Sequence, residues 1–285
     1  MKVRIGVDMR LWGDSIGVGH LPQLEMLAFL GYEGVAVPLA GQGLSELKLL
    51  RVALTDLDLV PLATTIIPAE FNPIDASERV RKRAVDYLKQ RVDEAVELGS
   101  EVLCGGLFQA QGQLSGVPPT DREWDWSRRC LREVGEHAAG YGVKLGLEFQ
   151  SRFDAHLVNT AAEAARMCRE IDLDNVGVLY NTFHAHLEEF NPARALPAAG
   201  ERLLMVHLSE SHRGELGRGQ VQWHETFATL DFLDYYGWLV VQALGVAAPG
   251  DADSAHIWRE RFDSREQLCA DAIGLVQQTL RLQRE

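Results

Sequence analysis

Polar groups able to perform acid–base or metal chemistry are concentrated in one short stretch, V-H-L-S-E-S-H-R-G, which begins at Val206. An apolar run from Leu203 leads into it, and His207, Glu210 and Arg213 then place an imidazole, a carboxylate and a guanidinium close together. Such groups beside a core need hydrogen-bonding partners or solvent. Two interpretations stay open: a buried strand that delivers polar groups to a binding site, or a strand end whose polar residues meet water.

The segments that must position these groups alternate along the whole chain. Short runs rich in Val, Ile and Leu are followed by longer segments of helical period, which is typical of βα units around a parallel sheet. We expect strands near residues 3–7, 34–37, 59–65, 102–104, 144–148, 176–180, 203–208 and 238–244. We also expect Ser77 to begin a long helix that ends at Gly99, and a last helix over residues 264–282. Eight such units can close into a single (β/α)8 TIM barrel, an α/β fold that spans residues 1–285 as one domain.

Composition limits the class of protein. A hydrophobic content of 46% and a charged content of 24% are typical of soluble globular proteins. A net charge of -13 argues against nucleic acid as a partner, because phosphate binding needs a concentrated basic surface. The four cysteines show no C-x-x-C spacing, and neither a signal peptide nor a long apolar run is visible. We therefore expect a cytoplasmic protein that contacts no membrane.

The carboxyl ends of the strands carry the chemistry in a barrel of this kind. In chain order, the polar candidates at these ends are Glu148, Asp154, Asn181, His184, His207, Glu210, Arg213 and Gln242. Gln242 stands alone inside the apolar V-V-Q-A-L, either as a buried hydrogen-bonding residue or as a group that faces a ligand. No glycine-rich phosphate loop is evident, so the sequence predicts no nucleotide cofactor and an unphosphorylated substrate.

Three segments together resemble, in order and spacing, the sugar 3-epimerases of the D-tagatose and D-psicose (allulose) type, which belong to the xylose isomerase-like barrels. They are L-E-F-Q-S-R-F-D-A-H-L-V-N-T-A-A-E, N-T-F-H-A-H-L-E-E and H-L-S-E-S-H-R-G-E-L-G-R-G-Q-V-Q-W. The region around Trp12 and the helix Y-L-K-Q-R-V-D-E-A-V-E-L-G are also similar, so the resemblance covers nearly the whole chain. It implies a sugar or sugar-like small molecule as substrate, and a homo-oligomer, dimer or tetramer.

The resemblance also implies a metal site. In that family a divalent cation, usually manganese, cobalt or magnesium, is held by Glu, Asp, His and Glu from the last four strands. Two of those carboxylates move protons on either face of the substrate's C3. By this resemblance Glu148 is the first metal ligand and the first catalytic base, and His207 is the histidine ligand. The aspartate position holds Asn181, and the position of the second ligand and catalytic glutamate holds Gln242.

Substrate binding is implied for a second group of residues. By resemblance, His184 and Arg213 hold the ketose oxygens, and Asp154 stands where the family has a longer glutamate that reaches the substrate. Glu210 and Trp12 also follow the family pattern and complete the predicted substrate-binding set. Glu210 is further expected to orient the neighbouring histidine or arginine of its strand end.

The two amides change what the site can do. Amide oxygens can coordinate hard cations, but replacing anions by neutral dipoles weakens divalent-ion binding, so we expect a weakly held Mn²⁺, Co²⁺ or Mg²⁺. Gln242 cannot accept and return a proton as a carboxylate does. The usual mechanism with two carboxylates is therefore not expected.

Three functions remain open from the sequence. The first is a sugar isomerase or epimerase in which Glu148 removes a proton α to a carbonyl of a ketose or related sugar. The second is a lyase, or another metal-independent acid–base enzyme, acting on a sugar-like substrate. The third is a sugar-binding pseudoenzyme without catalysis, because fold alone does not establish function.

Overall fold

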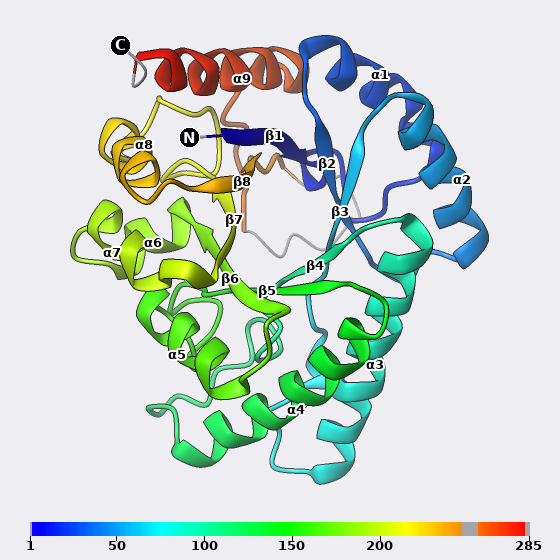
Figure 1. The fold of residues 1–285 in the computed structure, drawn as a ribbon, viewed down its shortest axis with the longest axis vertical. Coiled ribbons are helices and arrows are strands. Elements are labelled where there is room, and N and C mark those ends of the chain that lie inside the picture. Colours follow the sequence, from blue (N-terminus) through cyan, green and yellow to red (C-terminus); the bar gives the residue numbers. More distant parts are fainter. Residues whose placement is uncertain (1, 247–255, 283–285) are drawn as a thin grey trace.

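Eight parallel strands close into a barrel in the computed structural model, which describes residues 2–246 and 256–282 (Figure 1). Each strand pairs with its neighbour in sequence, and the first pairs with the last, as the sequence predicts for a (β/α)8 fold. The strands are β1 (Lys2–Asp8), β2 (Gly34–Pro38), β3 (Val60–Thr64), β4 (Val102–Gly105), β5 (Lys144–Glu148), β6 (Val176–Asn181), β7 (Leu203–Leu208) and β8 (Tyr236–Val241).

Helices surround the barrel (Figure 1). In the described residues they are α1 (Leu21–Leu30), α2 (Leu44–Asp56), α3 (Glu78–Leu98), α4 (Asp121–Ala139), α5 (Ala161–Ile171), α6 (Thr182–Glu188), α7 (Pro192–Ala199), α8 (Trp223–Phe232) and α9 (Arg265–Leu282). Capping boxes at Thr120 and Thr160 begin α4 and α5, because each threonine and the glutamate three residues later satisfy backbone N–H groups. Ser77 begins α3 and Gly99, at φ 85°, ends it, as expected.

The barrel interior is a small apolar cluster with the site above it. Buried side chains such as Leu179, Met205 and Val240 form this cluster, apart from the larger core that contains the helix side chains. Side chains alternate along a strand, so positions two residues further on point the same way. Asn181, His207 and Gln242 stand at those positions, which directs their polar groups into the carboxyl end of the barrel.

Two sequence expectations need correction. The eighth strand was expected over residues 238–244, but β8 ends at Val241, and Gln242 follows it with its N–H donating to the Leu208 oxygen at 2.8 Å. The short helices α6 and α7 between the sixth and seventh strands were not expected. Asn181 and Asn191 begin them, each accepting a backbone N–H on its side chain.

Candidate active site

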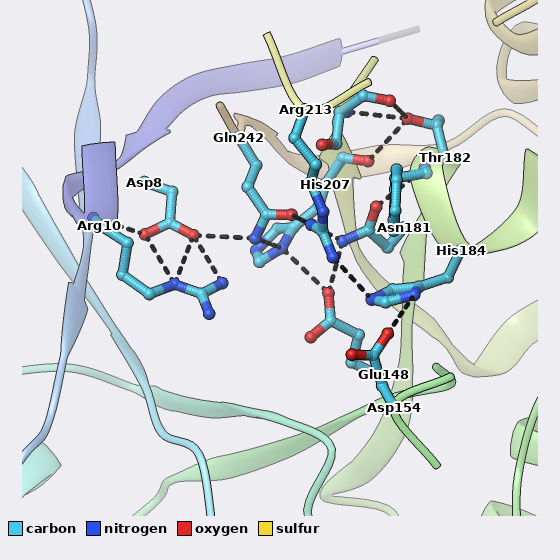
Figure 2. Close-up of polar contacts among 12 residues, drawn as sticks. Asp8, Arg10, Glu148, Asp154, Asn181, Thr182, His184, His207, Arg213 and Gln242 are labelled. Carbon is cyan, nitrogen blue, oxygen red and sulfur yellow. Dashed lines mark hydrogen bonds and ion pairs between the residues drawn. The ribbon is translucent and has the colours of Figure 1, made fainter. Parts of the chain in front are cut away.

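A pocket of about 400 Å³ lies at the carboxyl ends of the strands. The terminal residues of four strands, Pro38, Thr64, Gly105 and Glu148, are among its lining, together with His207, the residue before the end of β7. Four residues of the predicted site line it: Glu148, His184, His207 and Arg213. Asn181 and Gln242 lie behind them, fully buried, and Figure 2 shows the whole cluster converging. The structure thus brings the four residues of the predicted ligand set together.

Glu148 is a buried, ionised carboxylate at the end of β5. Its Oε1 accepts a hydrogen bond from Asn181 Nδ2 at 2.6 Å and lies 3.4 Å from His207 Nδ1. Burial alone would raise its pKa, but the hydrogen bond and charge of His207, with His184 and Arg10, hold that pKa well below its ordinary value. Glu148 is therefore the carboxylate of the cluster that is both charged and open to the pocket.

Asn181 is fixed by the helix that follows it. Its Oδ1 accepts the N–H of Phe183 at 3.0 Å and so caps α6. The Nδ2 group must then point the other way, where it donates to Glu148 and, at 2.9 Å, to Gln242 Oε1. The amide hydrogens of Asn181, rather than its oxygen, occupy the centre of the cluster.

Gln242 is the most connected residue of the cluster. Its Nε2 donates to Asp8 Oδ2 at 2.9 Å, and its Oε1 accepts from Arg213 Nη1 and from Asn181. The same Nε2 lies 3.1 Å from His207 Nδ1. Because a carboxylate faces one end of the amide and a guanidinium the other, its orientation is determined. Of the two interpretations left open by the sequence, the structure places Gln242 as a buried hydrogen-bonding residue behind the pocket.

The pair of Asp8 and Arg10 is the part of the site that sequence reasoning missed. Asp8 ends β1 fully buried, and Arg10 donates to its Oδ2 through Nε at 3.1 Å and Nη2 at 2.9 Å. Burial opposes ionisation of Asp8, but the charge of Arg10 lowers its pKa, and Arg10 itself lines the pocket. The alternation that places polar groups at other strand ends could have found Asp8, since V-D-M-R ends the first strand.

Arg213 is held in a left-handed backbone conformation, at φ 63°, which non-glycine residues seldom adopt. Its guanidinium carbon lies 3.8 Å from the ring centre of Phe183, and Nη1 donates to Gln242. Burial lowers the pKa of Arg213 to about 10, with Glu148 acting in the opposite direction. Arg213 is therefore cationic at neutral pH and faces the pocket.

His184 is neutral at neutral pH. Its Nδ1 accepts the N–H of Ser151 at 3.0 Å, and its Nε2 lies 3.3 Å from Arg213 Nη2. Burial, and then the charge of Arg213, lower the pKa of His184 to about 3. The imidazole is therefore uncharged, and its Nε2 atom faces the pocket.

Several polar atoms in the pocket lining are buried and have no hydrogen-bond partner within the described part of the chain. They are His207 Nε2, Gln150 Oε1, Thr64 Oγ1 and Arg91 Nε. Buried polar groups are normally paired, so unpaired ones around a single pocket indicate a ligand that supplies the partners. Gln150 and Arg91 were not predicted, because strand-end reasoning does not reach the loop after β5 or helix α3. Thr64 ends β3 and was missed although it stands at a strand end.

Three predicted substrate-binding residues lie outside the pocket lining: Asp154, Trp12 and Glu210. Asp154 accepts from Ser151 Oγ at 2.6 Å and lies 3.9 Å from His184 Nδ1, so it supports the histidine from behind. Trp12 packs against the hydrophobic core next to the short turn that follows β1. Contacts of these residues with a substrate stay predictions.

Glu210 is buried, and the hydrogen bonds of its side chain go to its own loop; the orientation of His207 or Arg213 by Glu210 stays a prediction. The Glu210 carboxylate accepts hydrogen bonds from this loop, over residues 211–223, and so fixes it. The donors are the N–H groups of Ser211, Gly217, Gln220 and Val221 and the Trp223 indole. Several converging N–H groups explain why the pKa of Glu210 is lowered in spite of burial.

The arrangement does not fit a divalent cation. Asn181 presents N–H groups to the centre, and the Gln242 oxygen is already bound by a guanidinium, so Glu148 and His207 are the two remaining donors. Within residues 2–246 and 256–282, no group of three or more His, Cys, Asp or Glu side chains could hold a metal ion. Turning the Asn181 oxygen inward would break its helix cap, at a cost of about 1 kcal/mol.

Fold and site together define a parallel barrel with a polar site at the carboxyl ends of its strands. The chain belongs to the xylose isomerase-like TIM barrel family, whose pattern matches residues 24–264. It is 25% identical to an L-ribulose 3-epimerase of Methylomonas sp. (strain DH-1), over 97% of this chain and 98% of that enzyme. A ketose 3-epimerase of Arthrobacter globiformis is 27% identical, over 98% and 97%. A solved L-ribulose 3-epimerase superposes with a TM-score of 0.92 at 26% identity, over 99% of this chain and 96% of that one.

Within the described residues, no helix is both long and apolar enough to cross a membrane.

Proposed function

We propose that the chain is a sugar isomerase or epimerase that removes a proton α to the carbonyl of a ketose or related sugar, with Glu148 as the base. The observation that carries this proposal is an ionised carboxylate lining a pocket that also contains a guanidinium, two imidazoles and unpaired polar atoms. The names of the related 3-epimerases support the same reaction class.

The reaction begins when Glu148 accepts the α-proton and the electrons of the broken C–H bond move into the carbonyl. The resulting enediolate carries negative charge on oxygen, which Arg213 and the Nε2 edge of His184 stabilise. Epimerisation requires a proton to return on the opposite face, and Gln242 cannot supply one. Glu148 can return its proton to the former carbonyl carbon on the same face, while the hydroxyl proton of the α-carbon moves to the former carbonyl oxygen; when the α-carbon is C1, this gives aldose–ketose isomerisation.

The set of ligands for a divalent cation is altered in this proposed site, and its affinity for the cation is weakened, because Asn181 and Gln242 replace two carboxylates. No step of the proposed reaction depends on a bound ion. His207 binds through its unpaired Nε2, which is available to a hydroxyl of the sugar.

One specific observation favours elimination as a second candidate. Gln242 stands where a second acid would act, and its amide is engaged by Asp8 and Arg213. An enediolate that is not reprotonated can expel a β-substituent, whose C–O bonding electrons leave with the oxygen. The lyase therefore uses the same Glu148 and the same pocket.

Deuterium exchange tests the proposal. The protein is incubated in deuterated water with L-ribulose, D-psicose and related ketoses, and the sugar is followed by NMR. We expect deuterium at the carbon α to the carbonyl, and loss of at least 1000-fold in exchange rate in Glu148→Gln. Glu101→Gln, an exposed residue before β4, is the matched control and should exchange normally.

The products separate the alternatives. An epimer or isomer supports the first function, and a dehydrated product supports the lyase. A sugar that is bound but recovered without deuterium would establish the sugar-binding pseudoenzyme instead. The predicted dimer or tetramer stays a prediction, which light scattering of the purified chain would measure.

A further inference from the structure

We propose that Arg213 supplies the positive charge of this site and that the site works without a metal ion, with Asn181 and Gln242 holding the arginine and the base in place. The inference rests on the proposed function, since it assigns the electrophile for the same proton abstraction. Three independent features of the structure support it: the atoms at the centre of the cluster, its charge balance and the way Arg213 is held.

The centre of the cluster is already filled by hydrogen-bond donors. Asn181 Nδ2 lies between Glu148 Oε1 at 2.6 Å and Gln242 Oε1 at 2.9 Å, so one amide group bridges two oxygens that would otherwise face each other. A cation between those oxygens would perform the same bridging. The amide therefore replaces it structurally, and no ion is needed to keep the oxygens together.

The cluster is electrically balanced by its own side chains. Two carboxylates, Asp8 and Glu148, are matched by two guanidiniums, Arg10 and Arg213. Asn181 and Gln242, which connect them, are neutral amides, and His207 adds no negative charge. Carboxylates at positions 181 and 242 would add two negative charges, which is the charge that one divalent cation neutralises. With amides at both positions, an added divalent cation would instead leave the buried cluster with excess positive charge, which is costly.

Arg213 is positioned for the role. Its backbone N–H donates to the backbone oxygen of Glu210 at 2.9 Å, and its backbone oxygen accepts from the backbone N–H of Leu244 at 2.8 Å, which holds the left-handed conformation. Its side chain lies over Phe183 and is tied to Gln242. Among the described residues its hydrogen-bonding partners are neutral, so its charge is available to an oxyanion that forms in the pocket.

Gln242 and Asn181 position Arg213 and the catalytic base. Gln242 connects Arg213 to Asp8, and Asn181 connects Gln242 to the catalytic Glu148. A chain of hydrogen bonds thus sets the distance between the base and the cation. This use of both amides explains why neither is free to offer an oxygen to an ion.

Metal binding gives the first test, with a readout independent of activity. The purified wild-type chain and Asn181→Asp/Gln242→Glu are dialysed against chelator and titrated with Mn²⁺ by electron paramagnetic resonance. We expect no saturable site in the wild type. The double variant should bind one Mn²⁺ roughly 100-fold more tightly or better, since even the outer partners of ligands change metal affinity about 10–100-fold. A saturable Mn²⁺ site in the wild type would overturn the proposal, and this result does not depend on the variant folding.

Isotope exchange gives the second test. Chelator-treated wild type should retain its exchange rate, and Arg213→Gln should lower kcat by roughly 100–1000-fold, the effect of removing one oxyanion donor. Arg213→Lys, which keeps the charge, should recover part of that loss. Exchange that vanishes in chelator and returns with Mn²⁺ would overturn the metal-free site while leaving the proposed function intact. No exchange under any condition would instead reject the proposed function.

Discussion

Replacing Gln242 by glutamate is the sharpest single perturbation of the site. The substitution replaces the amide NH₂ group by an oxygen and keeps the size of the side chain. In the wild type, Gln242 Nε2 donates to the fully buried Asp8 carboxylate at 2.9 Å. In Gln242→Glu two carboxylates face each other at that contact, while the other oxygen keeps its bond from Arg213. The new carboxyl group should therefore hold a proton at pH values where an exposed glutamate has lost it.

The size of the effect follows from that pKa. A carboxyl group buried beside another has a pKa raised by about 2–3 units, from about 4.3 in the unfolded chain. Each unit corresponds to about 1.4 kcal/mol, so the variant should lose roughly 3–4 kcal/mol of unfolding free energy at pH 8. The loss of unfolding free energy should be only about 0.5 kcal/mol at pH 4.5, because the folded variant carries the proton there and the unfolded carboxyl group is close to half protonated. The sign is fixed: the folded variant binds more protons than the unfolded one, so its stability falls as pH rises.

Thermal unfolding across pH measures this difference. The melting temperature of Gln242→Glu, relative to wild type at each pH, should drop by roughly 5 °C between pH 4.5 and pH 8. Gln242→Met is the matched control, because it removes the same hydrogen bonds without adding a charge. The melting temperature of this control should lie below that of the wild type by nearly the same amount at every pH. If the melting temperature of Gln242→Glu, relative to wild type, is also constant with pH, then position 242 does not contact the Asp8 carboxylate, and the prediction is refuted.

Three further predictions concern other parts of the site. Since burial lowers the pKa of Arg213 to about 10, kcat should fall as pH rises above about 10, and a profile that stays flat to pH 11 would contradict the role of its charge. Glu210→Gln should destabilise the chain by roughly 2–3 kcal/mol, because a single amide oxygen cannot accept the converging loop donors, and proteolysis should cut the 211–223 loop faster. In Gly106→Ala the new Cβ would lie 2.7 Å from the Gln150 amide, so Gln150 should move and weaken sugar binding in calorimetry, with little change in melting temperature.

The fold could be read from the sequence because its signals are local and repeated. Strands β5 (Lys144–Glu148) and β7 (Leu203–Leu208) have the bounds that their apolar runs predict, and helix α3 ends at Gly99 as expected. Helices α6 and α7 were missed for a local reason too. They are short and begin at asparagines inside a stretch whose histidines and glutamates were interpreted only as candidate site residues.

The site was only partly readable, because the sequence gives types of residue but not the direction of their atoms. Glu148, His184, His207 and Arg213 were identified and do line the pocket. The orientation of the amides, in contrast, depends on partners far away in the chain. Asp8 is 234 residues from Gln242, and no spacing rule connects them.

Asp8 gives the physical reason why an amide suits position 242. A buried carboxylate at the end of β1 needs a donor in addition to Arg10, and β8 is the strand that pairs with β1 on that side. Gln242 supplies the donor with one end of its amide and, with the other, the acceptor that Arg213 and Asn181 require. A carboxylate cannot meet both demands, since it has no hydrogen to give to Asp8. The amides at 181 and 242 therefore depend on each other: Asn181 gives the Gln242 oxygen its second donor, and Gln242 keeps Arg213 beside the base.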